Sequence, residues 1–414
     1  MLHLTIWIIS IVSIAGVIIR PFKLPEAVWA VGGACLLVFL GLIPIRQAGI
    51  AIGKGTDVYL FLTGMMLLAE TAREEKLFDW LAAHATKLAK GSPGRLFFLI
   101  YFVGIIVTIF LSNDATAVVL TPAVAAAARA AKVEKPLPYL LICAFIANAA
   151  SFVLPISNPA NLVIYGSHMP PLRHWIPLYI LPSFCAIVVT FIMLRWTQRK
   201  SLRQEIHTDI TIPALSPGGR TALYGIAATA IVLIIASALD LQLGLPTAIT
   251  GALTAAIVIL RVKKSPWIVV RGVSWVILPL VAGLFIIVEA IGSTGLVRWL
   301  ADVLHQQAAL STTGTVWGSG WLVAIVSNLA NNLPVGLFAG SVMQAGQVSE
   351  MIRSAVLIGV DLGPNLSVTG SLATILWLVA LRREGQSVSA WTFLKLGALI
   401  MTAALIAAIA ALWI

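Results

Sequence analysis

The sequence predicts an all-α polytopic membrane protein with about ten transmembrane helices in two inverted repeats, each with a re-entrant helical hairpin and a broken helix. Three observations predict this fold class: an apolar composition, a series of long apolar segments, and a residue pattern that recurs in both halves. Of 414 residues, 60% are hydrophobic and only 10% are charged, whereas soluble domains carry about 25% charged residues. A water-soluble fold could not cover so much apolar surface, so we expect a lipid bilayer to surround the chain.

Apolar segments follow one another along the chain, at roughly 2–19, 26–43, 57–71, 95–130, 137–165, 175–195, 220–239, 245–260, 272–291, 315–345, 353–381 and 392–413. A polar stretch rich in Ser, Pro and charge separates the sixth segment from the seventh. We therefore divide the chain into a first transmembrane repeat (1–196), a cytoplasmic linker (197–219) and a second transmembrane repeat (220–414).

The two halves resemble each other in sequence. At a constant offset of 219 residues, identical residues recur: Gly64, Glu70, Leu77, Trp80, Leu81 and Ala82 match Gly283, Glu289, Leu296, Trp299, Leu300 and Ala301. Further on, Ser112-Asn113 matches Ser327-Asn328 at an offset of 215, as one loop deletion would produce. Internal duplication of this kind is typical of secondary transporters.

Two long segments predict re-entrant hairpins. The segments 95–130 and 315–345 have polar residues at their centres, Ser112-Asn113-Asp114 in the first and 327–334 in the second. Each arm of the first hairpin has about 17 residues or fewer, near the minimum for crossing a hydrocarbon core of about 30 Å. A hairpin that enters and leaves on one side fits this length better than two full spans.

Two other segments predict broken helices. Polar, proline-containing stretches interrupt 137–165 at 155–161 and 353–381 at 363–370. Proline removes a backbone donor and ends the helical hydrogen-bond ladder. Unpaired backbone at membrane depth is tolerated only inside protein or beside a water-filled cavity, so both breaks indicate a buried site.

The basic residues predict the orientation. With five spans per half, 22 of the 27 lysines and arginines fall in loops on one side, which we assign to the cytoplasm. Both termini are then expected to be extracytoplasmic. Because this positive charge lies in short loops between apolar segments, the net charge of +11 indicates topology rather than a nucleic-acid partner.

Uncharged polar residues in the breaks are the candidate substrate-binding residues, since amides and hydroxyls both donate and accept hydrogen bonds. The first set is Ser112, Asn113, Thr116, Ser157, Asn158 and Asn161. The second set is Ser327, Asn328, Asn331, Asn332, Asn365, Ser367, Thr369 and Ser371. The alternative is that they only cap the ends of broken helices.

Acidic residues inside spans are costly and usually functional. Asp114 at the first hairpin tip and Asp361 before the second break are the candidates for proton coupling, and we expect Asp114 to face Asn158. Glu70 and Glu289 are further candidates, with a structural role near span ends as the alternative. Cys35, Cys143 and Cys185 are dispersed in apolar segments, which indicates no metal site by cysteine ligation. No cofactor is indicated.

These motifs resemble the ion transporter superfamily and, within it, the arsenite efflux pump family. The stretches that match are Ser-Asn-Asp-Ala-Thr-Ala-Val-Val-Leu-Thr-Pro (112–122), Ser-Asn-Pro-Ala-Asn-Leu-Val (157–163), Asn-Asn-Leu-Pro-Val-Gly (331–336) and Asp-Leu-Gly-Pro-Asn-Leu-Ser-Val-Thr-Gly-Ser-Leu-Ala-Thr-Ile-Leu-Trp (361–377). The last stretch is the most specific to the arsenite branch, and the paired-repeat plan agrees over essentially the whole chain.

The resemblance implies export of arsenite or antimonite, driven by inward proton movement, with binding at the hairpin tips and breaks. It also implies that some relatives couple to a soluble ATPase. This chain has no phosphate-binding loop motif, so an ATPase would be a separate subunit. Sodium/proton antiporters and organic-anion carriers share the superfamily plan and are the alternatives. No Arg or Lys lies near the tips in sequence, which argues against an anion.

Overall fold

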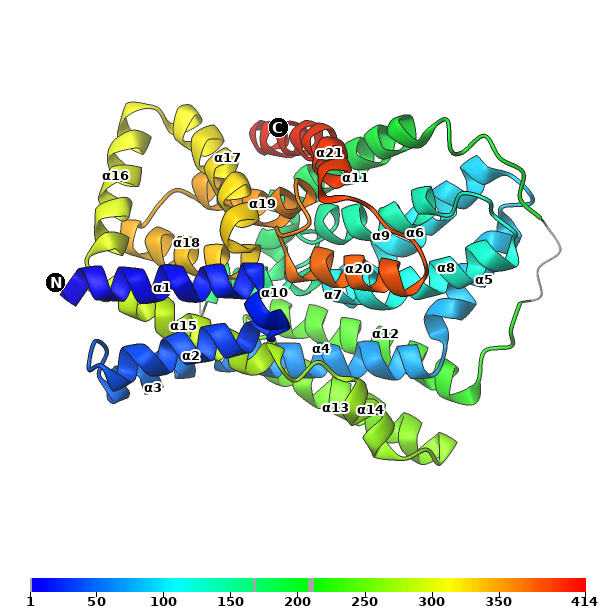
Figure 1. Ribbon diagram of the computed structural model, residues 1–414, viewed down its shortest axis with the longest axis horizontal. Helices are drawn as coiled ribbons and strands as arrows, with labels where there is room; N and C mark the ends of the chain where they lie inside the picture. The colour runs from blue at the N-terminus through cyan, green and yellow to red at the C-terminus, as the bar shows by residue number, and fades with distance from the viewer. Residues whose placement is uncertain (1, 167–168, 208–211) are drawn as a thin grey trace.

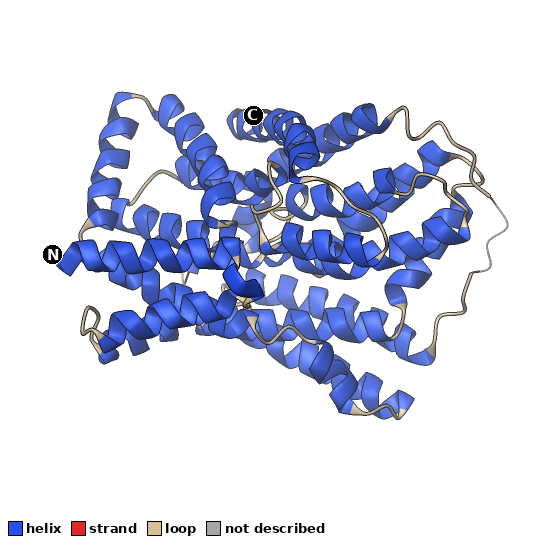
Figure 2. Ribbon diagram, in the orientation of Figure 1, coloured by secondary structure: helices blue, strands red, loops and turns tan. Residues whose placement is uncertain are grey.

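The computed structural model describes residues 2–166, 169–207 and 212–414, and within these ranges it consists of helices and connecting loops without a strand (Figure 2). The helices of the first half are α1 (Leu2–Ile19), η1 (Pro21–Lys23), α2 (Glu26–Phe39), α3 (Ile45–Lys54), α4 (Thr56–Glu74), α5 (Leu77–Leu88), α6 (Pro93–Phe110), α7 (Asn113–Ala115), η2 (Thr116–Leu120), α8 (Thr121–Ala130), α9 (Leu137–Ala149), η3 (Pro155–Ser157), α10 (Pro159–Tyr165) and α11 (Leu172–Gln198).

The second half contains helices of the same kinds in the same order. They are α12 (Pro217–Ala238), α13 (Gly244–Val262), α14 (Pro266–Gly272), α15 (Ile277–Ser293), α16 (Leu296–Leu310), α17 (Thr312–Ala330), α18 (Asn332–Gly346), α19 (Glu350–Leu362), η5 (Gly363–Asn365), α20 (Leu372–Arg383), α21 (Ala390–Ala410) and η6 (Ala411–Trp413). Long α4 corresponds to α15, and the interrupted pair α9–α10 corresponds to α19–α20.

Pairs of helices also pack in matching ways. Helix α4 packs along α13, and α15, the counterpart of α4, packs along α2. Both crossings are close because glycine lies at the contact: a Cβ at Gly64 would collide with the carbonyl of Thr247, and one at Gly283 with the backbone of Ala30. Helices α11 and α21 pack on each other (Figure 1). This agreement accords with a duplicated unit, while the division at 197–219 and the inverted orientation stay predictions.

Among the described residues, six helices are long and apolar enough to cross a membrane, or seven if the bent pair α3–α4 is one span. The chain is therefore a multi-pass membrane protein. Helices α1, α2 and α9 are apolar but shorter. Helix α9 is short because it is only half of a broken segment. The count of ten spans stays a prediction.

In each half, one part of the broken helix packs against the hairpin of the other half. The arms of the first hairpin are α6 and the continuous run α7–η2–α8, and those of the second are α17 and α18. Helix α10, from the first half, packs on α18, whereas α20, from the second half, packs on η2 and α8. Helices α7, α10 and α20 accordingly lie in the middle of the molecule (Figure 1).

Candidate substrate site

Four of the predicted site residues begin the helices that start at the breaks. Ser112 Oγ accepts a hydrogen bond from the backbone N–H of Ala115 at 3.2 Å, and Ser371 Oγ accepts one from Thr374 at 3.1 Å. The side chains of Asn158 and Asn331 likewise cap α10 and α18. The capping role considered from the sequence therefore holds for these four, and four helix N-termini with partial positive charge begin at the breaks.

Asn328 connects the second hairpin to the second break. Its Nδ2 donates to the carbonyl of Gly363 at 2.9 Å, and its Oδ1 accepts from the backbone N–H and the hydroxyl of Ser367 at 3.0 and 2.8 Å. The hydroxyl of Thr369 donates to the Asn328 carbonyl, and the N–H of Asn332 donates to the carbonyl of Gly370. Asn328, Ser367 and Thr369 of the second predicted set thus form one connected group. The side chain of Asn331 caps α18, the hydroxyl of Ser327 bonds within α17, and Asn365 and Ser371 bond elsewhere.

Contacts within the first set are fewer. Ser157 Oγ donates to the carbonyl of Ile109 in the first hairpin at 3.1 Å, and Thr116 shares a 2.8 Å hydrogen bond with Thr108. Asn161 Nδ2 donates to the carbonyl of Ser151 at 2.9 Å, within its own break. Asn113 Oδ1 accepts from the backbone N–H that follows it.

The two breaks meet at Asp361. Asn158 Nδ2 donates to Asp361 Oδ1 at 2.6 Å, so the expectation that Asn158 faces Asp114 is wrong. The reason is that α10, from the first half, packs among helices of the second half, so its N-terminus lies against the end of α19. Asp361 is fully buried, and its Oδ2 has no hydrogen-bond partner in the described chain.

Sequence reasoning missed Asn148, which lies inside the apolar run of α9. Its Nδ2 donates to Asn365 Oδ1 at 2.9 Å, and Asn365 Nδ2 donates to the carbonyl of Phe145 at 3.0 Å. Ser371 and Thr374 lie within 3.5 Å of the same amide. An asparagine in the middle of an Ala- and Ile-rich span was the signal that could have identified it.

Asp114 faces a cavity of about 90 Å³, which we call the first cavity. Its polar lining comes from Ser112, Asp114, Glu70 and Ser274, and Pro159 of α10 borders it. Within the described chain the Asp114 carboxylate makes no hydrogen bond or ion pair. This carboxylate is thus directly available to a solute or a proton.

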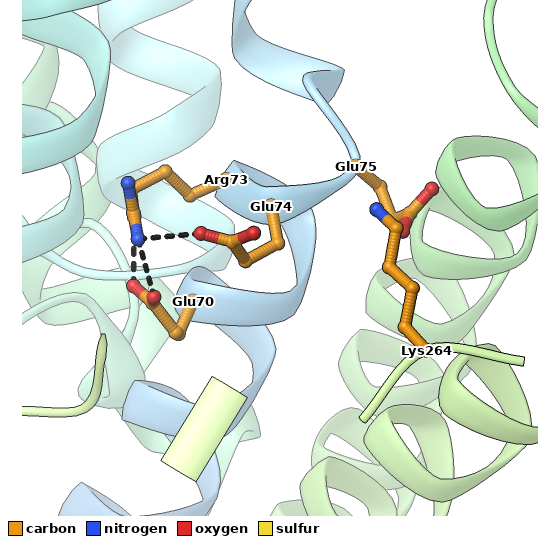
Figure 3. A network of polar contacts seen from close by, with 5 residues as sticks. All are labelled: Glu70, Arg73, Glu74, Glu75 and Lys264. Atoms are coloured by element: carbon orange, nitrogen blue, oxygen red, sulfur yellow. Dashed lines mark hydrogen bonds and ion pairs between the residues drawn. The ribbon is translucent and has the colours of Figure 1, made fainter. Parts of the chain in front are cut away.

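Glu70 lies in the same cavity but is already paired. Arg73 Nη2 lies 2.5 Å from Glu70 Oε1 and 2.7 Å from Glu74 Oε1. Figure 3 draws both contacts as dashed lines. Nearby, Glu75 is buried against Lys264 at 2.7 Å, which ties the end of α4 to the α13–α14 loop. Glu289 does not reach the first cavity and pairs instead with Lys54 at 2.7 Å.

The three cysteines lie apart from this site. Cys35 is exposed on α2, Cys143 is buried in α9, and Cys185 is partly buried in α11. None of them lines the first cavity.

The fold and the site define a multi-pass transporter with paired hairpins and broken helices. The family model for the CitMHS citrate transporters matches residues 6–359, and the chain belongs to this family. It is 27% identical over 425 residues to an arsenical pump membrane protein of Escherichia coli, covering 98% of this chain and 97% of the relative.

A second relative is the arsenical pump membrane protein of Yersinia enterocolitica, 27% identical over 91% of this chain and 89% of the relative. Among solved structures, the YdaH transporter of Alcanivorax borkumensis superposes with a TM-score of 0.60 at 16% identity, over 89% of this chain and 87% of that one. This structural likeness concerns the fold.

Proposed function

We propose that this protein exports trivalent arsenic, as arsenite, and antimonite from the cytoplasm by proton antiport with alternating access. The observation that carries the proposal is the first cavity, where an unpaired Asp114 carboxylate lies beside Ser112 at the tip of a hairpin. The names of the E. coli and Yersinia relatives support the same substrate.

The lining of the first cavity suits an uncharged solute. Trivalent arsenic near neutral pH is mainly the trihydroxide, whose hydroxyls both donate and accept hydrogen bonds. The described residues that line the cavity include no lysine, arginine or histidine. A neutral solute needs hydrogen-bonding groups rather than a counter-charge, and the tip supplies them.

Export against a gradient requires a coupled ion, because membrane potential does no work on a neutral solute. A carboxylate that faces the cavity can release a proton as the solute enters, and Asp114 is the group so placed. Asp361 is the second candidate, since it is fully buried between the two breaks and one of its oxygens is unpaired in the described chain.

An organic-anion carrier is the alternative that the citrate transporter family favours. Cationic side chains are the strongest partners for a carboxylate-bearing substrate, and helix N-termini also bind such groups. Arg73, which lies on α4 three residues after the cavity-lining Glu70, is engaged by Glu70 and Glu74. The acidic lining therefore supports the neutral solute over the anion. A sodium/proton antiporter is a further alternative in the same superfamily.

Everted membrane vesicles test the proposal, because their lumen corresponds to the outside of the cell. An acidic lumen should drive radiolabelled arsenite inward, antimonite should compete, and citrate should not. Arsenite uptake that ignores the pH gradient would overturn proton antiport, and pH-driven citrate uptake without arsenite uptake would establish the organic-anion carrier. Sodium-dependent proton flux would establish the sodium antiporter. Repeating the assay with no soluble ATPase present tests whether a separate subunit is needed.

A further inference from the structure

A second cavity, of about 380 Å³, lies at the opposite end of α4. Lys54 at the end of α3 lines it together with Thr56 and Asp57 at the start of α4, whereas Glu70 lines the first cavity near the end of α4. With a rise of about 1.5 Å per residue, Asp57 and Glu70 are roughly 20 Å apart along the helix. The two cavities therefore lie one after the other along α4.

The second cavity is built from the counterparts of the elements that build the first. Glu289 of α15 lines the second, and its counterpart in the repeat, Glu70 of α4, lines the first. Leu162 of α10 borders the second, and Leu376 of α20 borders the first. Each carboxylate has a basic partner, Lys54 for Glu289 and Arg73 for Glu70.

Apolar side chains separate the two cavities. Phe61 and Leu62 of α4 face the first cavity, and Val58 and Phe285 face the second. The ring of Tyr59 packs edge-on against Phe285, with centroids 6.2 Å apart. The two cavities share no lining residue among those described.

Hydrogen-bonding groups are abundant in the second cavity. The polar residues that line it are Lys54, Thr56, Asp57, Gln242, Glu289, Ser341 and Gln344. Among the described residues that line it, one cation and two carboxylates give a formal charge of −1, which disfavours an anion. A water molecule needs about 10–15 Å³ of such volume, so a solute with four heavy atoms fits with water around it.

We propose that the second cavity is a second binding site for a small uncharged polyhydroxyl solute, the trihydroxide of arsenic or antimony. This inference rests on the proposed function and adds a site from which the solute leaves after crossing the apolar barrier. Ser341 is placed to accept a hydrogen bond from the solute, because its own hydroxyl donates to Leu337 within α18. Gln344, whose amide reaches the carbonyl of Tyr165 at 3.3 Å, lies one turn further along the same helix.

Equilibrium dialysis of the purified full chain against radiolabelled arsenite tests this site. The chain should carry Cys35→Ala, Cys143→Ala and Cys185→Ala, so that no thiol binds arsenic. We expect two arsenic atoms per chain, falling to one in the Ser341→Leu, Gln344→Leu double variant. Leu337→Trp fills the same cavity from another position and should give the same loss. Ser319→Leu, on α17 and outside both cavities, should retain two.

The outcomes separate the two proposals. One arsenic atom per chain, unchanged by the cavity variants, overturns the second site and leaves the proposed function standing. Two bound arsenic atoms per chain in both the Ser341→Leu, Gln344→Leu variant and Leu337→Trp would show that the second site is not in this cavity. No bound arsenic overturns the proposed function itself. Size-exclusion chromatography of each variant shows that the chain is folded before binding is measured.

Discussion

Single polar side chains in this protein hold the interrupted backbone in place. Asn328 illustrates this, because one amide satisfies the carbonyl of Gly363 and accepts from both the N–H and the hydroxyl of Ser367. A buried polar group that loses its partner costs about 1–3 kcal/mol. A residue that the sequence marked as a binding candidate therefore determines where the helices stop.

Asn328→Ala should lower stability by about 1–3 kcal/mol, since it leaves Gly363 and Ser367 without these partners. Asn332→Ala is the matched control, because the Asn332 side chain makes no hydrogen bond in the described chain and only its backbone N–H bonds to Gly370. Thermal unfolding in detergent measures the melting temperature of both variants. Equal melting temperatures for the two variants would contradict the role given to Asn328.

Asp114→Asn should still bind arsenite but should take it up at the same rate with and without a pH gradient. The substitution keeps the shape and the hydrogen-bonding capacity at the first cavity but removes the titrating group. Vesicle uptake at several luminal pH values measures this. If Asp114→Asn keeps a normal pH response and Asp361→Asn loses it, the proton is carried at Asp361. If both keep it, coupling by these carboxylates is wrong, and Glu70 and Glu289 are the next residues to test.

Replacing Cys35, Cys143 and Cys185 together by alanine should leave most arsenite transport intact. None of the three lines the first or the second cavity, and their positions on α2, α9 and α11 allow no shared ligation of one arsenic atom. Growth in arsenite, with membrane expression checked by immunoblot, measures the effect. Loss of resistance at normal expression would restore a thiolate site.

At the scale of helices, glycine controls how closely α4 and α15 pack against their neighbours. Gly64 faces the backbone of α13 at Thr247 and Ala248, and Gly251 of α13 faces Gly64 in return. Gly283 of α15 meets α2 in the same manner at Ala30. Small residues at such crossings allow the close packing that stabilises helix pairs in membranes.

Gly64→Ala and Gly283→Ala should each lower the melting temperature, because the added methyl group meets backbone atoms that no rotamer change can move. Gly318→Ala, on α17, is the control, since a Cβ there has open space around it. It should be neutral or slightly stabilising, as alanine is favoured over glycine in helices by up to about 1 kcal/mol. The same loss at Gly318 as at Gly64 would rule out close packing as the cause.

At the scale of the whole molecule, the distribution of charge predicts how the protein lies in the membrane. If Arg73 and Arg271 lie on the cytoplasmic side, as the charge distribution predicts, the first cavity would be nearer the cytoplasm and the second nearer the outside. Lys54 and Arg353, on the side of the second cavity, belong to the smaller group of basic residues that are predicted to lie outside the cytoplasm. That order of the cavities would match the proposed direction of export.

Reporter fusions should place both termini outside the cytoplasm. A periplasmic reporter such as alkaline phosphatase should be active at the C-terminus, and a cytoplasmic one such as green fluorescent protein should be dark there but fluorescent in the 197–219 linker. The physical reason is the retention of positively charged loops in the cytoplasm. A fluorescent C-terminal fusion would contradict the ten-span layout.

Much of this architecture is determined by the sequence itself, because membrane helices are long apolar runs and their breaks require proline, glycine and polar residues. The all-helical fold, the interruptions near 112, 158, 331 and 365, and the family were all predictable from these local patterns. Periodicity and composition act over neighbouring residues, so such features can be read without knowing how distant segments pack.

Only the tertiary structure decided which breaks meet. Asn158 bonds to Asp361 rather than facing Asp114, and Asn148 bonds to Asn365, because each broken helix places one half against the hairpin of the other repeat. Those partners are more than 200 residues apart, and no local pattern encodes such pairing. The separation of Glu70 and Glu289 into two cavities likewise follows from packing, since in sequence they are equivalent residues of a duplicated unit.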